Sequence, residues 1–283
     1  MGRRQVEEKF FKVLMLFSLG VVLAGLASIL ITVFLKGFRA LDLDMLTKTP
    51  KGGYYIGEEG GILNAILGSL ALGVGATFLA LIISLPLVFY LNVYLKKKSF
   101  AAFAARFTLD LLWGIPSIVY GAFGFTIMVF FGWRASLLAA MCTIALLIIP
   151  IMARSMDEIL KMISVELKEA SYALGSTSWE TAVRVIIPQA LPGIITAILI
   201  SFGRGIGDAA AVLFTAGFSD NIPTSLFKPV ATLPLAIFFQ LGTPFPEVQA
   251  RGYASALILS ILVLALSILS RILSRKYTKH TIK

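Results

Sequence analysis

Long apolar segments alternate with polar connections from the beginning of the chain to its end. Six of these segments are long enough to cross a bilayer as helices, which takes roughly 20 residues each. They cover about residues 13–35, 66–95, 108–131, 135–153, 193–216 and 253–273. This pattern predicts an all-α integral membrane protein with six transmembrane helices, and we expect residues 1–283 to form a single transmembrane domain.

The composition agrees with this class and excludes an ordinary soluble domain. Charged residues make up 14% of the chain, whereas about a quarter of the residues in a soluble domain are charged. The first apolar segment follows four basic residues and is too long for a secretory signal peptide, so we expect a retained first span. The single cysteine, Cys142, is expected to be buried in the fourth span and cannot form an intramolecular disulfide.

The lysines and arginines indicate the orientation of the spans, because cytoplasmic connections of membrane proteins carry an excess of them. If both termini are cytoplasmic, seventeen of these residues lie in inside segments and seven in outside segments. Lys97, Lys98, Lys279 and Lys283 are among the inside residues. The net charge of +10 is therefore spread along the connections and is explained by topology, not by a patch that binds nucleic acid.

Prolines and glycines interrupt some of the predicted spans. Pro86 lies in the second span, and Gly114, Ile115 and Pro116 lie in the third. A membrane helix can break at such positions where neighbouring helices or a cavity satisfy the freed backbone groups, and an ordinary kink is the alternative. The outside connection, residues 217–252, is rich in proline and contains an apolar stretch too short to span, so we expect an interfacial or re-entrant element there.

The connection between the fourth and fifth spans, residues 154–192, is long and has its own helical pattern. Gly175 is placed to end a first helix as its C-cap. Thr177 and Glu180 have the spacing of a capping box that starts a second helix, and Pro188 precedes the fifth span. The pattern predicts a cytoplasmic helix–turn–helix elbow, with a plain amphipathic helix on the lipid headgroups as the alternative. The apolar positions of the first helix are Met156, Ile159, Leu160, Ile163 and Leu167.

This elbow carries a recognisable motif. Glu169, Ala170 and Ser171, with Gly175 six positions after Glu169 and an aliphatic run ending at Pro188, resemble the EAA motif of ABC-importer permeases. Ser171 stands where the family has a second alanine. The resemblance implies a type I ABC-importer permease fold in which the elbow is the coupling helix. The motif residues Glu169, Ala170, Ser171, Gly175 and Pro188 would then place this helix in a groove of a cytoplasmic ATPase subunit.

Arg204 and Asp208 are a charged pair in the apolar fifth span. They are four residues apart and would share one face of a helix. A charge at mid-membrane costs roughly 2.5–3.5 kcal/mol on insertion scales, so a compensating interaction or a function must account for the pair. One interpretation is mutual neutralisation. The other is a translocation path in which Arg204 binds an oxyanion, while Asp208 holds Arg204 or accepts a proton from a partly protonated anion. Gly203, Gly207 and Ala211 would form a stripe of small residues on the same helix.

Several segments point to one branch of the ABC-importer permeases. Residues 203–216, 114–121 and 64–70 resemble the phosphate-importer permeases of the Pst type. Residues 229–234 resemble the A-type subunit of that system more than its C-type partner. One departure concerns Asp208, which stands where the family usually has glutamate, so the negative charge is kept and the reach is shorter.

The resemblance implies a permease subunit of an ATP-driven importer of inorganic phosphate in a prokaryotic inner membrane. The implied partners are a second homologous permease in a heterodimer, two ATPase subunits and an extracytoplasmic phosphate-binding protein. The sequence contains no phosphate-binding loop of the Gly-x-x-x-x-Gly-Lys-Ser/Thr type and no catalytic constellation, so ATP and Mg are expected in the partner ATPase. We expect that the chain is not an enzyme and that it binds no cofactor or metal itself. The implied substrate path comprises Arg204, Asp208, Ser117, Tyr120 and Thr215.

Two other functions fit part of the sequence. A permease for sulfate, molybdate or tungstate would use the same arginine chemistry. A secondary transporter or channel driven by an ion gradient would use Arg204 and Asp208 as a proton or ion relay, and it would need no ATPase.

Overall fold

The computed structural model describes residues 3–51, 59–96 and 99–278, and the regular secondary structure of the described part is helical apart from two short strands. Lys97, Lys98, Lys279 and Lys283 lie outside the described residues. The strands β1 (Pro50–Lys51) and β2 (Glu59–Gly60) pair antiparallel. The helical elements are α1 (Arg3–Ala40), α2 (Leu43–Thr47), α3 (Leu63–Phe89), the π-helical turn η1 (Tyr90–Tyr94), α4 (Phe100–Trp113), α5 (Ser117–Phe130), α6 (Leu137–Lys161), α7 (Val165–Ala173), α8 (Ser178–Thr181), the π-helical turn η2 (Ala182–Ile186), α9 (Ile187–Ile206), α10 (Leu233–Leu241) and α11 (Pro246–Thr278).

The described residues contain five helical stretches that are long and apolar enough to cross a membrane. A sixth span is formed if α4 and α5 are taken together, and these two helices are bent by 99° at Gly114, Ile115 and Pro116. Pro116 lacks an N–H group and disfavours helical geometry at Ile115, so the predicted third span is a break and not a mild kink. The five continuous stretches are Glu7–Ala40, Leu63–Tyr94, Leu137–Lys161, Ser178–Ile206 and Pro246–Leu273.

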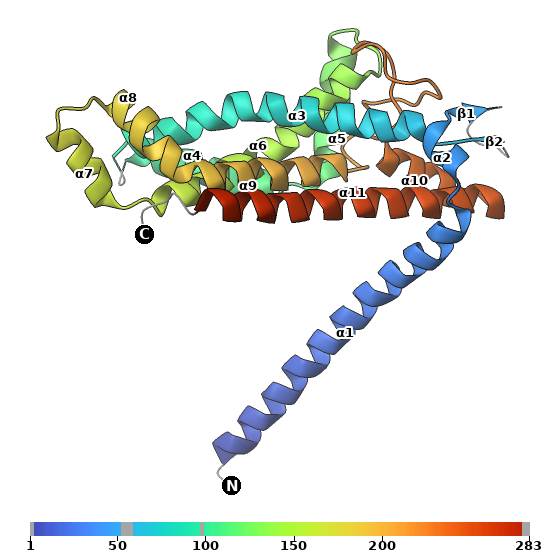
Figure 1. Ribbon diagram of the computed structural model, residues 1–283, viewed down its shortest axis with the longest axis horizontal. Coiled ribbons are helices and arrows are strands. Elements are labelled where there is room, and N and C mark those ends of the chain that lie inside the picture. The colour runs from blue at the N-terminus through green and yellow to red at the C-terminus, as the bar shows by residue number, and fades with distance from the viewer. Residues whose placement is uncertain (1–2, 52–58, 97–98, 279–283) are drawn as a thin grey trace.

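Helix α6 lies at the centre of the bundle and is buried over most of its length. It packs against α3, α4, α5 and α9 through small and aliphatic side chains such as Ala140, Ile144 and Ile148. Cys142 is an exception, because it is exposed on the side of α6 that this chain leaves uncovered. Helix α1 leaves the bundle at an angle and touches α11 where Gly37 meets Tyr253 (Figure 1).

The two ends of the bundle are different. Helices α7 and α8 form a projection at one end, which we call the elbow end (Figure 1). Helix α2, the two strands and α10 lie at the opposite end. The predicted helix–turn–helix elbow is therefore present, although its first helix is interrupted. Helix α6 ends at Lys161, and α7 begins at Val165 after a new N-cap, Ser164.

The fifth span begins earlier and ends earlier than the predicted residues 193–216. Its helix is continuous from Ser178 to Ile206 and runs through Pro188 and Pro192. Pro188 comes two residues after the wider π-helical turn η2, which ends at Ile186. We attribute the continuity to this turn, because it relieves the crowding that a proline ring causes against the preceding turn of an α-helix. Residues 208–216 form turns instead of helix.

The connection predicted to be interfacial or re-entrant is folded into the end of the bundle. Its helix α10 has buried residues, including Leu233 and Leu235. The hydroxyl of Ser69 on α3 accepts the N–H of Leu233 at 2.7 Å, and the side chain of Asn64 donates to the carbonyl of Ser219 at 2.8 Å. Two of the four segments singled out by their sequence resemblance, residues 64–70 and 229–234, therefore pack against each other.

The tightest point of this packing yields a prediction. A Cβ atom added at Gly68 would lie 1.9 Å from the carbonyl oxygen of Ala231. We expect Gly68→Ala to destabilise the protein by about 1–3 kcal/mol, because backbone must shift to admit the methyl group. Gly20→Ala is the matched control, since no atom lies within 4 Å of that position. Thermal unfolding in detergent measures both, and equal midpoints for the two variants would contradict the packing.

Candidate functional site

Arg204 and Asp208 form an ion pair, which both interpretations of the sequence allow, but they do not lie on one helix. Arg204 is in the last turn of α9, and Asp208 follows the helix end at Gly207. Arg204 Nη2 lies 3.1 Å from Asp208 Oδ2. Asp208 is buried, and its Oδ1 accepts the N–H of Ala211 at 2.8 Å. The carboxylate therefore closes the turn after α9 and holds the guanidinium at the same time.

The two members of the pair differ in exposure. The side chain of Arg204 is 50% exposed and that of Asp208 is 3% exposed. No heavy atom lies within 4 Å of a Cβ placed at Gly203, beside Arg204, when the backbone of its own helix is left aside. Gly203 therefore borders open space and Gly207 is exposed, whereas Ala211 is buried beyond the helix end and does not continue a stripe of small residues. The exposed half of the Arg204 side chain therefore faces space that this chain does not fill.

The three other predicted substrate-path residues lie on α5 and on the turns after α9. These segments are in contact, because a Cβ at Gly121 would lie 2.8 Å from the carbonyl oxygen of Ala210. Ser117 is half-buried in the first turn of α5. Tyr120 and Thr215 are both buried. The fold thus brings the predicted residues into one region, but only Arg204 and Ser117 have appreciable exposure.

Tyr120 has a structural partner that the sequence did not suggest. Its hydroxyl donates to the carbonyl oxygen of Leu112 at 2.8 Å. Leu112 belongs to the last turn of α4 and Tyr120 to α5, so this bond crosses the bend between the two helices. The carbonyl of Leu112 also accepts the N–H of Ile115 at 3.2 Å, so the tyrosine hydroxyl adds a second partner from across the bend.

The elbow forms as its sequence predicts. Gly175 has a φ of +82°, a conformation that favours glycine. Its N–H donates to the carbonyl of Tyr172 at 2.9 Å, and the N–H of Ser176 donates to that of Ser171 at 3.3 Å. These two bonds are the Schellman arrangement that ends a helix. The capping box between Thr177 and Glu180 is also present at the start of α8.

Ser171, the departure from the family motif, contributes a contact inside the elbow. Its hydroxyl lies 2.9 Å from the hydroxyl of Thr181, and both side chains are buried. The contact joins α7 to the end of α8. At the start of α7, the N–H of Glu166 itself and the hydroxyl of Ser164 lower the pKa of the Glu166 carboxyl, which keeps a negative charge at a helix N-terminus.

The outer surface of the elbow is a candidate docking surface. Glu169 and Ala170 are exposed on α7. Leu174 and Trp179 are 87% and 66% exposed and lie close to them in the chain. Exposed apolar side chains grouped with charges are typical of protein interaction sites. Pro188 is also exposed, but it lies beyond the elbow at the start of α9.

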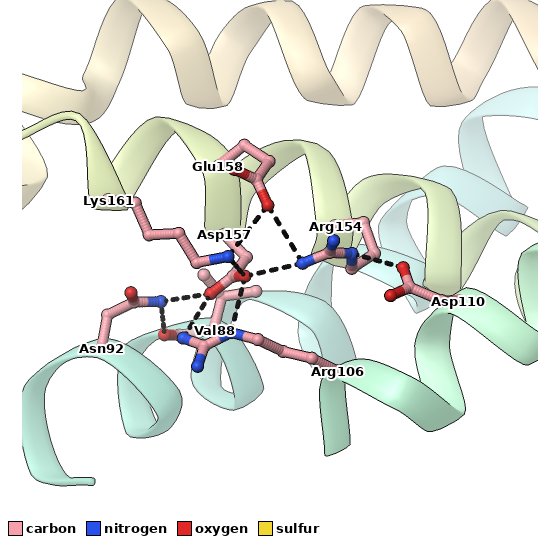
Figure 2. A network of polar contacts seen from close by, with 8 residues as sticks. All are labelled: Val88, Asn92, Arg106, Asp110, Arg154, Asp157, Glu158 and Lys161. Atoms are coloured by element: carbon pink, nitrogen blue, oxygen red, sulfur yellow. Dashed lines mark hydrogen bonds and ion pairs between the residues drawn. The ribbon is translucent and has the colours of Figure 1, made fainter. Parts of the chain in front are cut away.

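A network of polar contacts lies where the elbow joins the bundle, and Figure 2 shows it from close by. At its centre is Asp157 of α6, whose side chain is 0% exposed. The side chains of Asn92, Arg106, Arg154 and Lys161 all lie within 3.0 Å of its carboxylate oxygens. Sequence reasoning did not single out Asp157 and missed the network. The spacing of Arg154 and Lys161, three and four residues away, was the available signal.

Apolar spans, a projecting elbow with a candidate docking surface and a half-exposed arginine at the end of the fifth span are together typical of a membrane-embedded transport permease. Solved structures support the fold. The inward-facing MetNI methionine ABC transporter matches with a TM-score of 0.63 and 22% identity, covering 77% of this chain and 96% of that one. A bacterial alginate ABC transporter matches with a TM-score of 0.63 and 12% identity over 99% of both chains.

Sequence comparisons identify the family. Residues 82–279 match the family described as "Binding-protein-dependent transport system inner membrane component". The phosphate transport system permease protein PstA of Yersinia pestis is 34% identical over 95% of this chain and 91% of its own length. The PstA protein of Mycobacterium leprae is 34% identical over 94% of this chain and 88% of its own length. The chain belongs to this family of transport permeases and, within it, to the PstA type.

The hydroxyl pair in the elbow can be tested by a double-mutant cycle. We expect Ser171→Ala to destabilise the protein by about 1 kcal/mol, because Thr181 keeps a buried hydroxyl without its partner. Ser171→Ala combined with Thr181→Val should cost less than the sum of the two single changes, since neither side chain then needs a bond. Thermal unfolding in detergent gives the three values, and strict additivity would show that the hydroxyls are not coupled.

Proposed function

We propose that this chain is the membrane permease subunit of an ATP-driven importer of inorganic phosphate in a prokaryotic inner membrane. The observation that carries the proposal is the half-exposed guanidinium of Arg204, fixed by the buried carboxylate of Asp208. An arginine so placed is suited to an anion that passes through an apolar bundle. The named function of the PstA relatives supplies the identity of the anion.

Arg204 binds the phosphate oxygens in transit through the N–H groups that Asp208 does not occupy. Its planar fork of donors matches the geometry of an oxyanion and makes strong, charge-assisted hydrogen bonds. Ser117 is a further donor, because its side chain is half-buried and its helix packs on the turns after Asp208. Tyr120 and Thr215 act indirectly, by holding α5 and those turns in place.

Asp208 favours phosphate over sulfate in this proposal. A carboxylate accepts a hydrogen bond from the protonated oxygen of hydrogen phosphate but repels an anion that carries no proton. Sulfate, molybdate and tungstate remain the alternative substrates, because the arginine alone recognises all of them. An ion-driven secondary transporter is disfavoured, since the family to which the chain belongs works with binding proteins.

The elbow end is the cytoplasmic end in this proposal, and both termini are cytoplasmic. The excess of lysine and arginine in the corresponding connections supports this orientation. An ATPase subunit docks on the exposed surface around Glu169, Ala170 and Gly175. The complete importer contains a second permease of the same type in a heterodimer, two ATPase subunits that bind ATP and Mg, and an extracytoplasmic phosphate-binding protein.

The substrate assignment is tested by Arg204→Gln. We expect phosphate uptake to fall by at least about tenfold, because a hydrogen bond to a charged group contributes roughly 1.5–3 kcal/mol and 1.4 kcal/mol is a factor of ten. Arg39→Gln is the control, since Arg39 is exposed in the last turn of α1 and is not one of the residues of the candidate substrate path. Uptake of labelled phosphate in cells measures both variants. Wild-type uptake by Arg204→Gln would rule out this role for the arginine.

The docking assignment is tested by Glu169→Lys. Reversing the charge on the proposed ATPase surface should reduce co-purification of the ATPase subunit and lower uptake to a similar degree. Glu247→Lys is the matched control, because Glu247 is exposed in the first turn of α11, away from the elbow. Unchanged co-purification and uptake in the Glu169 variant would place the docking surface elsewhere.

A further inference from the structure

The Asp157 network ties three parts of the bundle to one carboxylate. Oδ1 accepts from Asn92 Nδ2 at 2.8 Å and from Arg106 Nη2 at 2.9 Å. Oδ2 accepts from Arg106 Nε at 2.9 Å and lies 3.0 Å from Arg154 Nη1 and 2.7 Å from Lys161 Nζ. Arg106 is thus bidentate, which fixes its orientation as well as its distance. Figure 2 shows these side chains converging from different helices.

Helix α4 is held to α6 at two points. The first is the bidentate contact of Arg106 with Asp157. The second is the ion pair between Asp110 Oδ1 and Arg154 Nε, at 2.6 Å. Arg106 and Asp110 are one helical turn apart, so both contacts use the same face of α4. This arrangement prevents α4 from rolling or sliding on α6 unless the ion pairs break.

Asn92 extends the network to the end of α3. Its side-chain amide donates to Asp157 and also to the carbonyl oxygen of Val88, at 2.9 Å. Asn92 lies in the π-helical turn η1, and such turns are frequent at functional sites. The carbonyl of Val88 belongs to the last turn of α3, so one amide connects the end of that helix to the carboxylate on α6.

A contribution to stability does not by itself explain why so many charged side chains gather around Asp157. Removing charges from water is costly, and well-packed apolar residues often stabilise a buried site as well or better. Here Asp157 is fully buried, and Arg106 and Arg154 are 20% and 19% exposed. What ion pairs add is a fixed geometry and a stiff connection between the elements that carry them.

The network lies between the elbow and the candidate substrate site. On one side, Lys161 is the last residue of α6, and α7 begins after only Met162, Ile163 and Ser164. On the other side, α4 ends at the bend that the bond from Tyr120 to Leu112 closes. Helix α5 then contacts the turns that follow Asp208. A movement of α7 therefore has a continuous physical path to those turns.

We propose that Asp157 and Arg106 are positioning residues that transmit the movement of the elbow to the bend between α4 and α5. This rests on the proposed function, because it assumes that an ATPase moves the elbow. The pair makes α4 follow the end of α6, and α5 then shifts the turns that hold Asp208. Loss of the pair leaves ATP hydrolysis intact but separates it from transport.

A purely structural role predicts a different result. Physical contiguity does not by itself establish coupling, so the readout has to be one that stability does not change. That readout is the number of substrate ions transported per ATP hydrolysed. A variant that merely folds less well lowers both rates together and leaves this ratio unchanged, whereas a variant that uncouples the elbow lowers the ratio.

The experiment uses the complete importer in proteoliposomes, with both permeases, the ATPase subunits and the binding protein. Arg106→Gln removes the bidentate contact with α4 and leaves Asp157 paired with Arg154 and Lys161, so it preserves charge compensation for the buried carboxylate. Asp157→Asn is the second variant. Glu158→Gln is the control, because Glu158 is 58% exposed and contacts only Arg154 and Lys161 among the residues of the network.

We expect both test variants to lower the transport-to-hydrolysis ratio by at least about fivefold, the lower end of typical coupling between sites. The Glu158 control should keep the wild-type ratio. A wild-type ratio in assembled Arg106→Gln overturns the proposal, whatever Asp157→Asn does. Wild-type protein is assayed with phosphate, sulfate and molybdate. Transport of sulfate or molybdate in place of phosphate would refute the proposed substrate, and the ratio would then be measured with the transported anion.

Discussion

A polar group inside a lipid-embedded bundle has to find its partner within the protein, and the structure depends on this constraint. Three of the long-range polar contacts lie where helices end, begin or bend. Asp157 gathers its partners at the end of α6, Tyr120 bonds Leu112 across the bend between α4 and α5, and Ser69 accepts the N–H of Leu233 at the start of α10. Between these points the helices pack through small and aliphatic side chains around α6. Apolar packing thus holds the helices together, and polar contacts fix the points at which helices end or bend.

Two routes connect the elbow to the arginine site. The first is the helical stretch from Ser178 to Ile206, which carries the second half of the elbow at one end and Arg204 near the other. At 1.5 Å per residue it is a rod of roughly 40 Å. The second route passes through α6, the Asp157 network, α4 and α5. The routes meet at the turns after Asp208, where α5 touches the chain that leaves α9. A movement at the elbow can therefore act on Arg204 from two sides.

The sequence predicted most of the elements, because their signals are local. Apolar length located the spans, and Gly175 and the capping box of Thr177 and Glu180 located the elbow turn. It also identified Gly114, Ile115 and Pro116 as a place where a helix breaks or kinks, but the choice between them required the structure. The boundaries of the fifth span were wrong at both ends. Its composition stays apolar to residue 216, while the helix ends at Ile206 because Asp208 accepts a backbone N–H from the following turn.

The sequence by itself determined the membrane class, the approximate spans, the elbow and the spacing of Arg204 and Asp208, because each follows from composition or from neighbours a few residues apart. Only the tertiary structure decided which polar groups meet across the bundle. Asn92, Arg106 and Asp157 are far apart in the chain, and nothing local shows that they share one buried carboxylate. The same holds for Tyr120, whose hydroxyl bonds Leu112 only because α4 and α5 are bent. Long-range pairing depends on how helices pack, and packing is a property of the whole chain.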